Sequence, residues 1–211
     1  MSRSPQADRT KRAYQDEVRR VASRSIAGLE RTSVTPDALT VAGVGLCIAG
    51  SVIVYFEYRS HWCFFVGGLL FVVGSILDIL DGALARRSGK GTPFGAFLDS
   101  TVDRVGEGFM LGAVGLVLMR DGYEWGVALA FAAIGGSFLV SYTRARAEAL
   151  GLKGDVGIGS RAERVVVLSV GLGLAPFHEL VLPITIAVLA ASAWITVVQR
   201  VLSVRQQLRS G

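Results

Sequence analysis

The segment LFVVGSILDILDGALARR, residues 70–87, is an apolar run interrupted near its end by two aspartates. After a short polar connection, the segment GAFLDSTVDRVGEG, residues 95–108, places two more aspartates and a glutamate at the start of another apolar run. An unpaired carboxylate inside a membrane helix costs about 3 kcal/mol on insertion scales. The two segments therefore predict a pair of membrane helices whose acidic residues have a function. These residues are Asp78, Asp81, Asp99, Asp103 and Glu107.

The composition of the whole chain is that of an integral membrane protein. Of its 211 residues, 51% are apolar and only 18% are charged, whereas a soluble domain carries roughly 25% charged residues. Such a composition also excludes intrinsic disorder. Apolar runs of membrane-spanning length indicate an all-α polytopic fold with six transmembrane helices. The predicted spans are residues 38–57, 62–85, 94–119, 125–147, 161–177 and 181–202.

The chain before the first span is polar and basic. Within residues 8–30, apolar side chains recur at roughly helical spacing among Arg and Lys. This pattern predicts an N-terminal amphipathic helix that lies on the membrane surface, and a solvated basic arm is the alternative. We therefore predict a cytoplasmic N-terminal segment at 1–34, a membrane domain at 35–205 and a cytoplasmic tail at 206–211.

The distribution of Lys and Arg predicts the orientation in the membrane. Twenty of the 22 basic residues lie at the termini or at the connections near 86–94 and 144–164, if Arg104 is counted with its end of the third span. Only Arg59 and Arg120 lie on the opposite side. The positive-inside rule then places both termini and the acidic cluster on the cytoplasmic side of the cell membrane. The net charge of +5 indicates contact with the lipid bilayer and phosphate groups, not nucleic acid, because no aromatic residues interleave with the basic runs.

Helical spacing brings the four aspartates together. Asp78 and Asp81 are three residues apart, and Asp99 and Asp103 are four apart, so each pair shares a helix face. The two helices are antiparallel neighbours, so both pairs lie at a similar depth. A divalent cation would compensate the repulsion, and an all-oxygen site favours Mg²⁺ or Mn²⁺. Two alternatives stay open: ion pairs with Arg86, Arg104 or Arg144, and a cation pathway in a small transporter.

Other residues near the acids favour phosphate chemistry. Gly82 and Gly95 lack side chains, which would let a ligand approach the helix backbone, although such glycines more often serve helix packing. Arg86 lies at the same helix end and can bind a diphosphate.

In order, the residues read Asp78-x2-Asp81-Gly82-x2-Ala85-Arg86-x8-Gly95-x3-Asp99-x3-Asp103. This pattern resembles, at all eight fixed positions, the signature of the CDP-alcohol phosphotransferases. The resemblance implies a six-helix membrane enzyme, usually a homodimer, that uses Mg²⁺ or Mn²⁺. It also implies transfer of the phosphatidyl group of CDP-diacylglycerol to an alcohol, with release of CMP.

The resemblance assigns roles to individual residues. It implies that Asp78, Asp81 and Asp99 are metal ligands, and that Asp103 is both a ligand and the catalytic general base. It further implies contacts with the CDP-lipid by Thr35, Pro36, Asp37, Ala38, Gly82, Ala85, Arg86, Thr92 and Gly95.

A second group of basic residues is the candidate acceptor site. These residues lie near the cytoplasmic helix ends, where they can bind the phosphate of an acceptor, with anchoring to lipid headgroups as the alternative. They are Arg144, Lys153, Arg161, Arg164 and Arg200.

The segments SYTRARAE and GIGSRAER and the late Gln-Arg pair resemble those of actinobacterial phosphatidylinositol phosphate synthases. This resemblance implies transfer to inositol phosphate. The alternatives are phosphatidylglycerophosphate synthase with glycerol 3-phosphate as acceptor, archaetidylinositol phosphate synthase, and a small cation transporter.

Overall fold

The computed structural model describes residues 35–89 and 91–210, so the predicted amphipathic helix at 8–30 lies outside the described residues. The described chain is all-helical and contains no strand, which confirms that the fold is all-α. Two short 3₁₀ helices, η1 (Glu57–Arg59) and η2 (Ala175–Phe177), follow α2 and α6. The long helices are α2 (Pro36–Tyr55), α3 (Trp62–Ser88), α4 (Pro93–Arg120), α5 (Gly126–Ala149), α6 (Arg161–Leu174) and α7 (Val181–Ser210).

Three helices on the side of the acidic residues begin at recognisable capping residues. Thr35 and Thr92 are the N-caps of α2 and α4, and a proline follows each of them as the first helical residue. Proline suits this position because its missing N–H would have no partner in the first turn. Ser160 begins α6 with a capping box, in which its side chain and that of Glu163 bond each other's backbone N–H groups.

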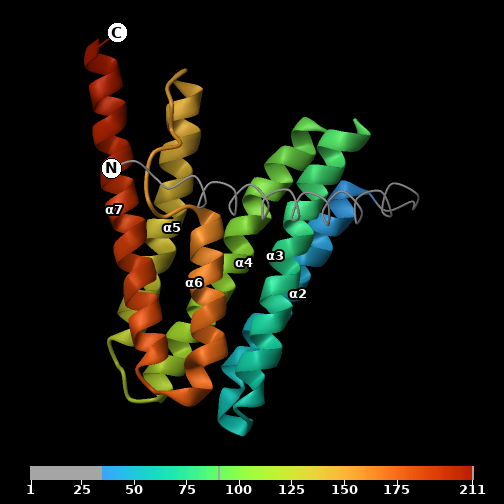
Figure 1. Ribbon diagram of the computed structural model, residues 1–211, viewed down its shortest axis with the longest axis vertical. Coiled ribbons are helices and arrows are strands. Elements are labelled where there is room, and N and C mark those ends of the chain that lie inside the picture. The colour runs from blue at the N-terminus through green and yellow to red at the C-terminus, as the bar shows by residue number, and fades with distance from the viewer. Residues whose placement is uncertain (1–34, 90, 211) are drawn as a thin grey trace, which may run out of the picture.

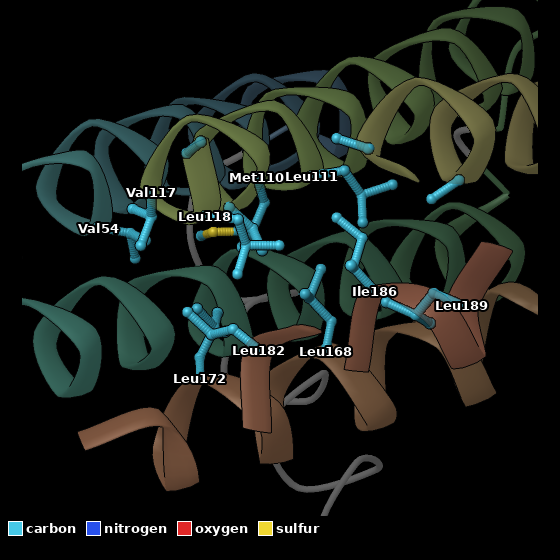
Figure 2. Packing of buried hydrophobic residues seen from close by; sticks show 14 of the residues in the cluster. Val54, Met110, Leu111, Val117, Leu118, Leu168, Leu172, Leu182, Ile186 and Leu189 are labelled. Carbon is cyan, nitrogen blue, oxygen red and sulfur yellow. The ribbon is translucent and has the colours of Figure 1, made fainter. Parts of the chain in front are cut away.

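The helices form a bundle with α4 in its middle. In Figure 1, α2 and α3 lie on one side, α5 and α7 lie on the other, and α6 lies in front. α4 packs against both α2 and α5, while α6 packs against α3 and α7. Figure 2 shows the apolar core, a single cluster to which Met110 and Val117 of α4, Leu172 of α6 and Ile186 of α7 all belong. In the first half of α4, Asp99 and Asp103 are half-buried and Glu107 is buried, and these side chains face α3 and α6.

Within the described residues, four helices are long and apolar enough to cross a membrane: Pro36–Tyr55, Trp62–Arg86, Gly126–Ala149 and Val181–Arg209. The chain is therefore an integral membrane protein. α4 is long enough to cross a membrane, but it is not counted with these four helices because its first half is rich in charged residues. α6 has 14 residues, which at ~1.5 Å per residue is about 21 Å, less than the ~30 Å of a bilayer core. The loop before α6 descends beside α7 before the helix begins (Figure 1).

Close backbone contact joins α2 to α3. A Cβ atom at Gly67 of α3 would lie 2.6 Å from the carbonyl oxygen of Gly50 and 2.6 Å from Cγ2 of Val54, both in α2. These distances are too short for any side chain. Small residues at such crossings are common in membrane bundles because they allow dispersion contacts between backbones.

We predict that Gly67→Ala destabilises the bundle by about 1–3 kcal/mol, because the added methyl group forces the two helices apart. The matched control is Gly45→Ala in α2, where an added Cβ meets no atom within 4 Å. Thermal unfolding in detergent should show a lower Tm for Gly67→Ala than for Gly45→Ala. Equal Tm values for the two variants would contradict the close contact.

Candidate active site

Three carboxylates from α3 and α4 meet in one cluster. Asp78 of α3 and Asp99 and Asp103 of α4 each offer a carboxylate oxygen, and these oxygens all lie within 4.8 Å of one another. The three residues are half-buried. The structure thus brings together three of the four aspartates that helical spacing places on facing surfaces.

Asp81 is buried next to this cluster and has a partner on a third helix. Its Oδ2 accepts a short hydrogen bond from the hydroxyl of Thr40 in α2. Its Oδ1 is buried and has no hydrogen-bond partner among the described residues. Burying a carboxylate oxygen without a hydrogen-bond donor costs free energy. Because Oδ1 of Asp81 has no such donor in the described part of the chain, it is free to bind a metal ion.

Arg161, the first residue of α6, provides the positive charge that faces the cluster. Its Nη1 donates to Oδ2 of Asp78 at 2.5 Å, and its Nη2 lies 2.5 Å from Oδ1 of Asp103. The sequence leaves open that the aspartates form ion pairs with Arg86, Arg104 or Arg144. The structure places Arg161 there instead, because the loop before α6 brings it down to the depth of the aspartates.

A second ion pair lies one turn deeper and joins a predicted acceptor residue, Arg164, to Glu107, which is assigned no specific role from the sequence. Arg164 of α6 binds Glu107 of α4 through two hydrogen bonds, from Nε at 2.7 Å and from Nη2 at 3.0 Å. Arg164 is 4% exposed and Glu107 is 5% exposed. Glu107 follows Asp103 by four residues on the same helix face, and this spacing was the available signal that it belongs with the cluster.

The other predicted acceptor residues have different surroundings. Arg200 of α7 is buried and donates from Nε to the carbonyl oxygen of Val156 at 2.8 Å, and from Nη1 to that of Val140. Arg144 is exposed and pairs with Glu148 at 2.9 Å. Lys153 is exposed on the loop between α5 and α6. Of the five predicted acceptor residues, only Arg161 forms ion pairs with the cluster's aspartates.

The residues predicted to contact the CDP-lipid include the adjacent starts of α2 and α4. A Cβ built on Gly95 would lie 3.0 Å from Oδ1 of Asp37 and 3.2 Å from Oγ1 of Thr92, so the two helix N-termini are neighbours. Thr92 Oγ1 accepts from the Gly95 N–H at 2.9 Å. Helix N-termini attract phosphate groups because their first N–H groups are free of helix partners.

The remaining predicted donor-site residues lie around this region. On α3, a Cβ at Gly82 would be 3.4 Å from Nη1 of Arg86, so the guanidinium covers the glycine. Arg86 is exposed and Ala85 is half-buried. At the start of α2, Pro36 is half-buried, whereas Thr35 and Ala38 are exposed.

The donor set fits a hard divalent cation. Three clustered carboxylates and the unpaired Oδ1 of Asp81 provide only oxygen ligands, and such sets bind Mg²⁺ or Mn²⁺ in preference to softer metals. The position of Arg161 shows in addition that the cluster attracts a positive charge.

Comparison with known proteins places this carboxylate site in a known enzyme family. A profile described as CDP-alcohol phosphatidyltransferase matches residues 33–202. The phosphatidylinositol phosphate synthase of Mycolicibacterium smegmatis is 37% identical over 206 residues, covering 93% of this chain and 87% of that protein. The archaetidylinositol phosphate synthase of Methanothermobacter thermautotrophicus is 36% identical over 182 residues, covering 85% and 88%.

Two crystal structures of the phosphatidylinositol phosphate synthase of Mycobacterium tuberculosis share the fold. The structure with CDP-DAG bound superposes with a TM-score of 0.76 at 33% identity and covers 88% of this chain and 94% of that one. The complex with manganese and citrate also has a TM-score of 0.76, at 32% identity, and covers 87% and 88%. Carboxylate cluster, helix arrangement and sequence similarity agree, and this chain is a member of the CDP-alcohol phosphatidyltransferase family, a group of metal-dependent transferases.

Proposed function

We propose that this protein transfers the phosphatidyl group of CDP-diacylglycerol to inositol phosphate, giving phosphatidylinositol phosphate and CMP. The observation that carries the proposal is the cluster of Asp78, Asp99 and Asp103, faced by Arg161 from α6. Negative carboxylates are needed to bind the metal, and positive groups are needed to bind the anionic donor and the phosphorylated acceptor. Both kinds of charge lie together here. Relatives named phosphatidylinositol phosphate synthase support the choice of acceptor. Membership of this family favours the enzyme over the cation transporter.

Asp78, Asp81, Asp99 and Asp103 would hold Mg²⁺ or Mn²⁺ in this proposal. When bound, the divalent cation supplies positive charge that stabilises the diphosphate and the departing CMP. The neighbouring N-termini of α2 and α4 and the guanidinium of Arg86 would hold the nucleotide end of the lipid. The full donor set comprises Thr35, Pro36, Asp37, Ala38, Gly82, Ala85, Arg86, Thr92 and Gly95.

Asp103 would act as the general base. Its carboxylate accepts the proton of the acceptor hydroxyl as the hydroxyl oxygen attacks the phosphorus that bears the diacylglycerol group. A bond forms between this oxygen and phosphorus, and the bond from phosphorus to the CMP phosphate oxygen breaks. CMP then leaves with the electron pair, so the step is balanced without a further reactant.

Among the five basic residues, we assign Arg161 to direct contact with the acceptor phosphate. Its guanidinium already faces Asp78 and Asp103. Arg144 and Lys153 are exposed and would attract the anion. Arg164 and Arg200 are buried and bond backbone carbonyl oxygens of this chain. We therefore propose that they form the buried side of the acceptor site.

We further propose a membrane arrangement with six spans. α4 would cross the bilayer because Asp103 and Glu107 are paired with arginines of α6, and α6 would do so together with the loop that precedes it. Both termini and the site would face the cytoplasm, as the Lys and Arg distribution predicts. We also propose a homodimer, with a cytoplasmic segment at 1–34, a membrane domain at 35–205 and a tail at 206–211.

The proposal is tested with the purified protein, CDP-diacylglycerol and Mg²⁺. Inositol phosphate, glycerol 3-phosphate, inositol and serine are offered in parallel, and CMP and the lipid product are measured. We expect product with inositol phosphate at a rate at least tenfold above the others. A preference for glycerol 3-phosphate would establish the phosphatidylglycerophosphate synthase alternative, and a donor carrying archaeal lipid chains tests the archaetidyl alternative.

We predict that Asp99→Asn weakens Mn²⁺ binding at least tenfold, because it removes one charged ligand from the cluster; a tenfold loss corresponds to ~1.4 kcal/mol. Electron paramagnetic resonance of free Mn²⁺ measures the affinity directly. The control is Glu179→Gln, an exposed carboxylate between η2 and α7. Unchanged affinity in Asp99→Asn would remove this residue from the metal site.

We predict that Asp103→Asn lowers kcat by about 10²–10⁴-fold, the range expected for loss of a general base, while CDP-diacylglycerol binding falls much less. The reason is that the base acts on the acceptor hydroxyl and not on the nucleotide. Steady-state kinetics and equilibrium binding of the lipid provide the two measurements. Equal losses in both would reduce Asp103 to a metal ligand.

A further inference from the structure

The connection between α5 and α6 is unusual because its non-helical backbone runs down beside α7 to the start of α6, and Gly154 and Gly159 in it are buried. Residues 151–160 form no helix, and α6 begins only at Arg161. In Figure 1 this loop runs down beside α7 to about the middle of the bundle. Irregular backbone at membrane depth persists only where protein or water satisfies its polar groups. The hydrogen bonds of this loop therefore reveal what holds it.

One peptide group of the loop is held by the side chain of Thr196 in α7. The Gly159 N–H donates to Oγ1 of Thr196 at 2.9 Å, and this hydroxyl in turn donates to the carbonyl oxygen of Ser192 at 2.8 Å. Thr196 is fully buried at 0% exposure. A Cβ at Gly159 would lie 2.8 Å from the same Oγ1, so the backbone can reach the threonine only as glycine.

The carbonyl oxygen of Gly159 is held by an arginine of α6. Gly159 O accepts from Nη1 of Arg164 at 2.7 Å. The other two nitrogens of this guanidinium bind both carboxylate oxygens of Glu107 in α4. A bidentate pair of this kind fixes both the position and the plane of the guanidinium. The Gly159 backbone is thus clamped between α7 and α4.

The clamp lies next to the residue that faces the aspartates. Ser160 follows Gly159 and caps α6, and Arg161 is the next residue. Its guanidinium reaches both Asp78 and Asp103. A shift of the Gly159 backbone moves the start of α6, and Arg161 moves with it. Displacement of this kind matters because small errors in the placement of a binding group are costly for catalysis.

We propose that Thr196 is a positioning residue of this enzyme: through the Gly159 peptide it sets the start of α6 and holds Arg161 against the carboxylate cluster, where the acceptor phosphate binds. The last clause rests on the proposed function. Thr196 lies on α7, outside the acidic motif, and its hydroxyl bonds the Gly159 N–H and the Ser192 carbonyl, not the aspartates or Arg161. Its effect on the acceptor is therefore indirect.

The test compares Thr196→Val, which removes the hydroxyl, with Thr196→Ser, which keeps it. Thr185→Val is the matched control, because Thr185 is also buried on α7 and its hydroxyl bonds its own helix, at Val181 O. Loss of one hydrogen bond worth about 0.5–1.5 kcal/mol should raise the KM for inositol phosphate roughly 2- to 12-fold. The KM for CDP-diacylglycerol should stay within twofold, and Thr196→Ser should resemble wild type.

A double-mutant cycle with Arg161→Gln tests whether Thr196 acts through Arg161. Once Arg161 is removed, Thr196→Val should have little further effect on the acceptor KM. An equal rise in both backgrounds would overturn the proposal. So would a serine variant that behaves like valine, since the methyl group and not the hydroxyl would then be responsible.

Amide hydrogen exchange of residues 157–164, measured without substrate, separates this inference from the proposed function. Exchange at Gly159 should accelerate in Thr196→Val and remain unchanged in Thr185→Val. Unchanged exchange in both variants would overturn the clamp whatever the acceptor. If the clamp loosens as expected but wild type does not use inositol phosphate, the proposed acceptor is wrong and the kinetic arm is repeated with the acceptor that is used.

Discussion

The ion pairs between α4 and α6 are the interaction on which the rest of this bundle depends. Carboxylates of α3 and α4 lie within an apolar helix bundle, where an uncompensated charge is expensive. Arg161 compensates Asp78 and Asp103, and Arg164 compensates Glu107. Both arginines come from the first turn of one helix. Without α6 at this depth, Asp78, Asp103 and Glu107 would lose these arginine partners.

This requirement accounts for the irregular part of the fold. An α6 that began near the level where α5 ends would carry its arginines above the aspartates. The loop before it instead descends along α7 and shortens the helix to 14 residues. Backbone groups of this loop are then satisfied by side chains, with Thr196 binding the Gly159 N–H and Arg200 the Val156 carbonyl. A shorter helix and a non-helical loop packed along α7 are thus consequences of charge placement.

The same electrostatics link the fold to its chemistry. A cluster that attracts a guanidinium also attracts a divalent cation, and all its ligand atoms are oxygens. The capped N-termini of α2 and α4 meet near Asp37 and Gly95 and add a surface suited to phosphate. Negative ligands for a metal and positive groups for anions therefore adjoin at one end of the bundle, as transfer between two anionic substrates requires.

The sequence alone determined the helices, because each apolar run and each capping threonine is a local signal. The predicted runs agree with α2 to α7 to within a few residues at most ends, and α7 continues as a helix to Ser210. Helical spacing also placed Asp78, Asp99 and Asp103 together, since a regular helix converts sequence separation directly into position on a face. Eight fixed positions within 26 residues carried the resemblance to the family, to which the chain belongs.

Only the tertiary structure decided which basic residue faces which acid. Arg161, Arg164 and Arg200 look alike in the sequence, as three arginines near helix ends. In the bundle they face aspartates, a glutamate and backbone carbonyls respectively. The difference arises from the course of the loop at 151–160, which depends on hydrogen bonds to α7 that are distant in sequence. Local patterns specify helices and faces, but the depth at which one helix meets another is set by such long-range contacts.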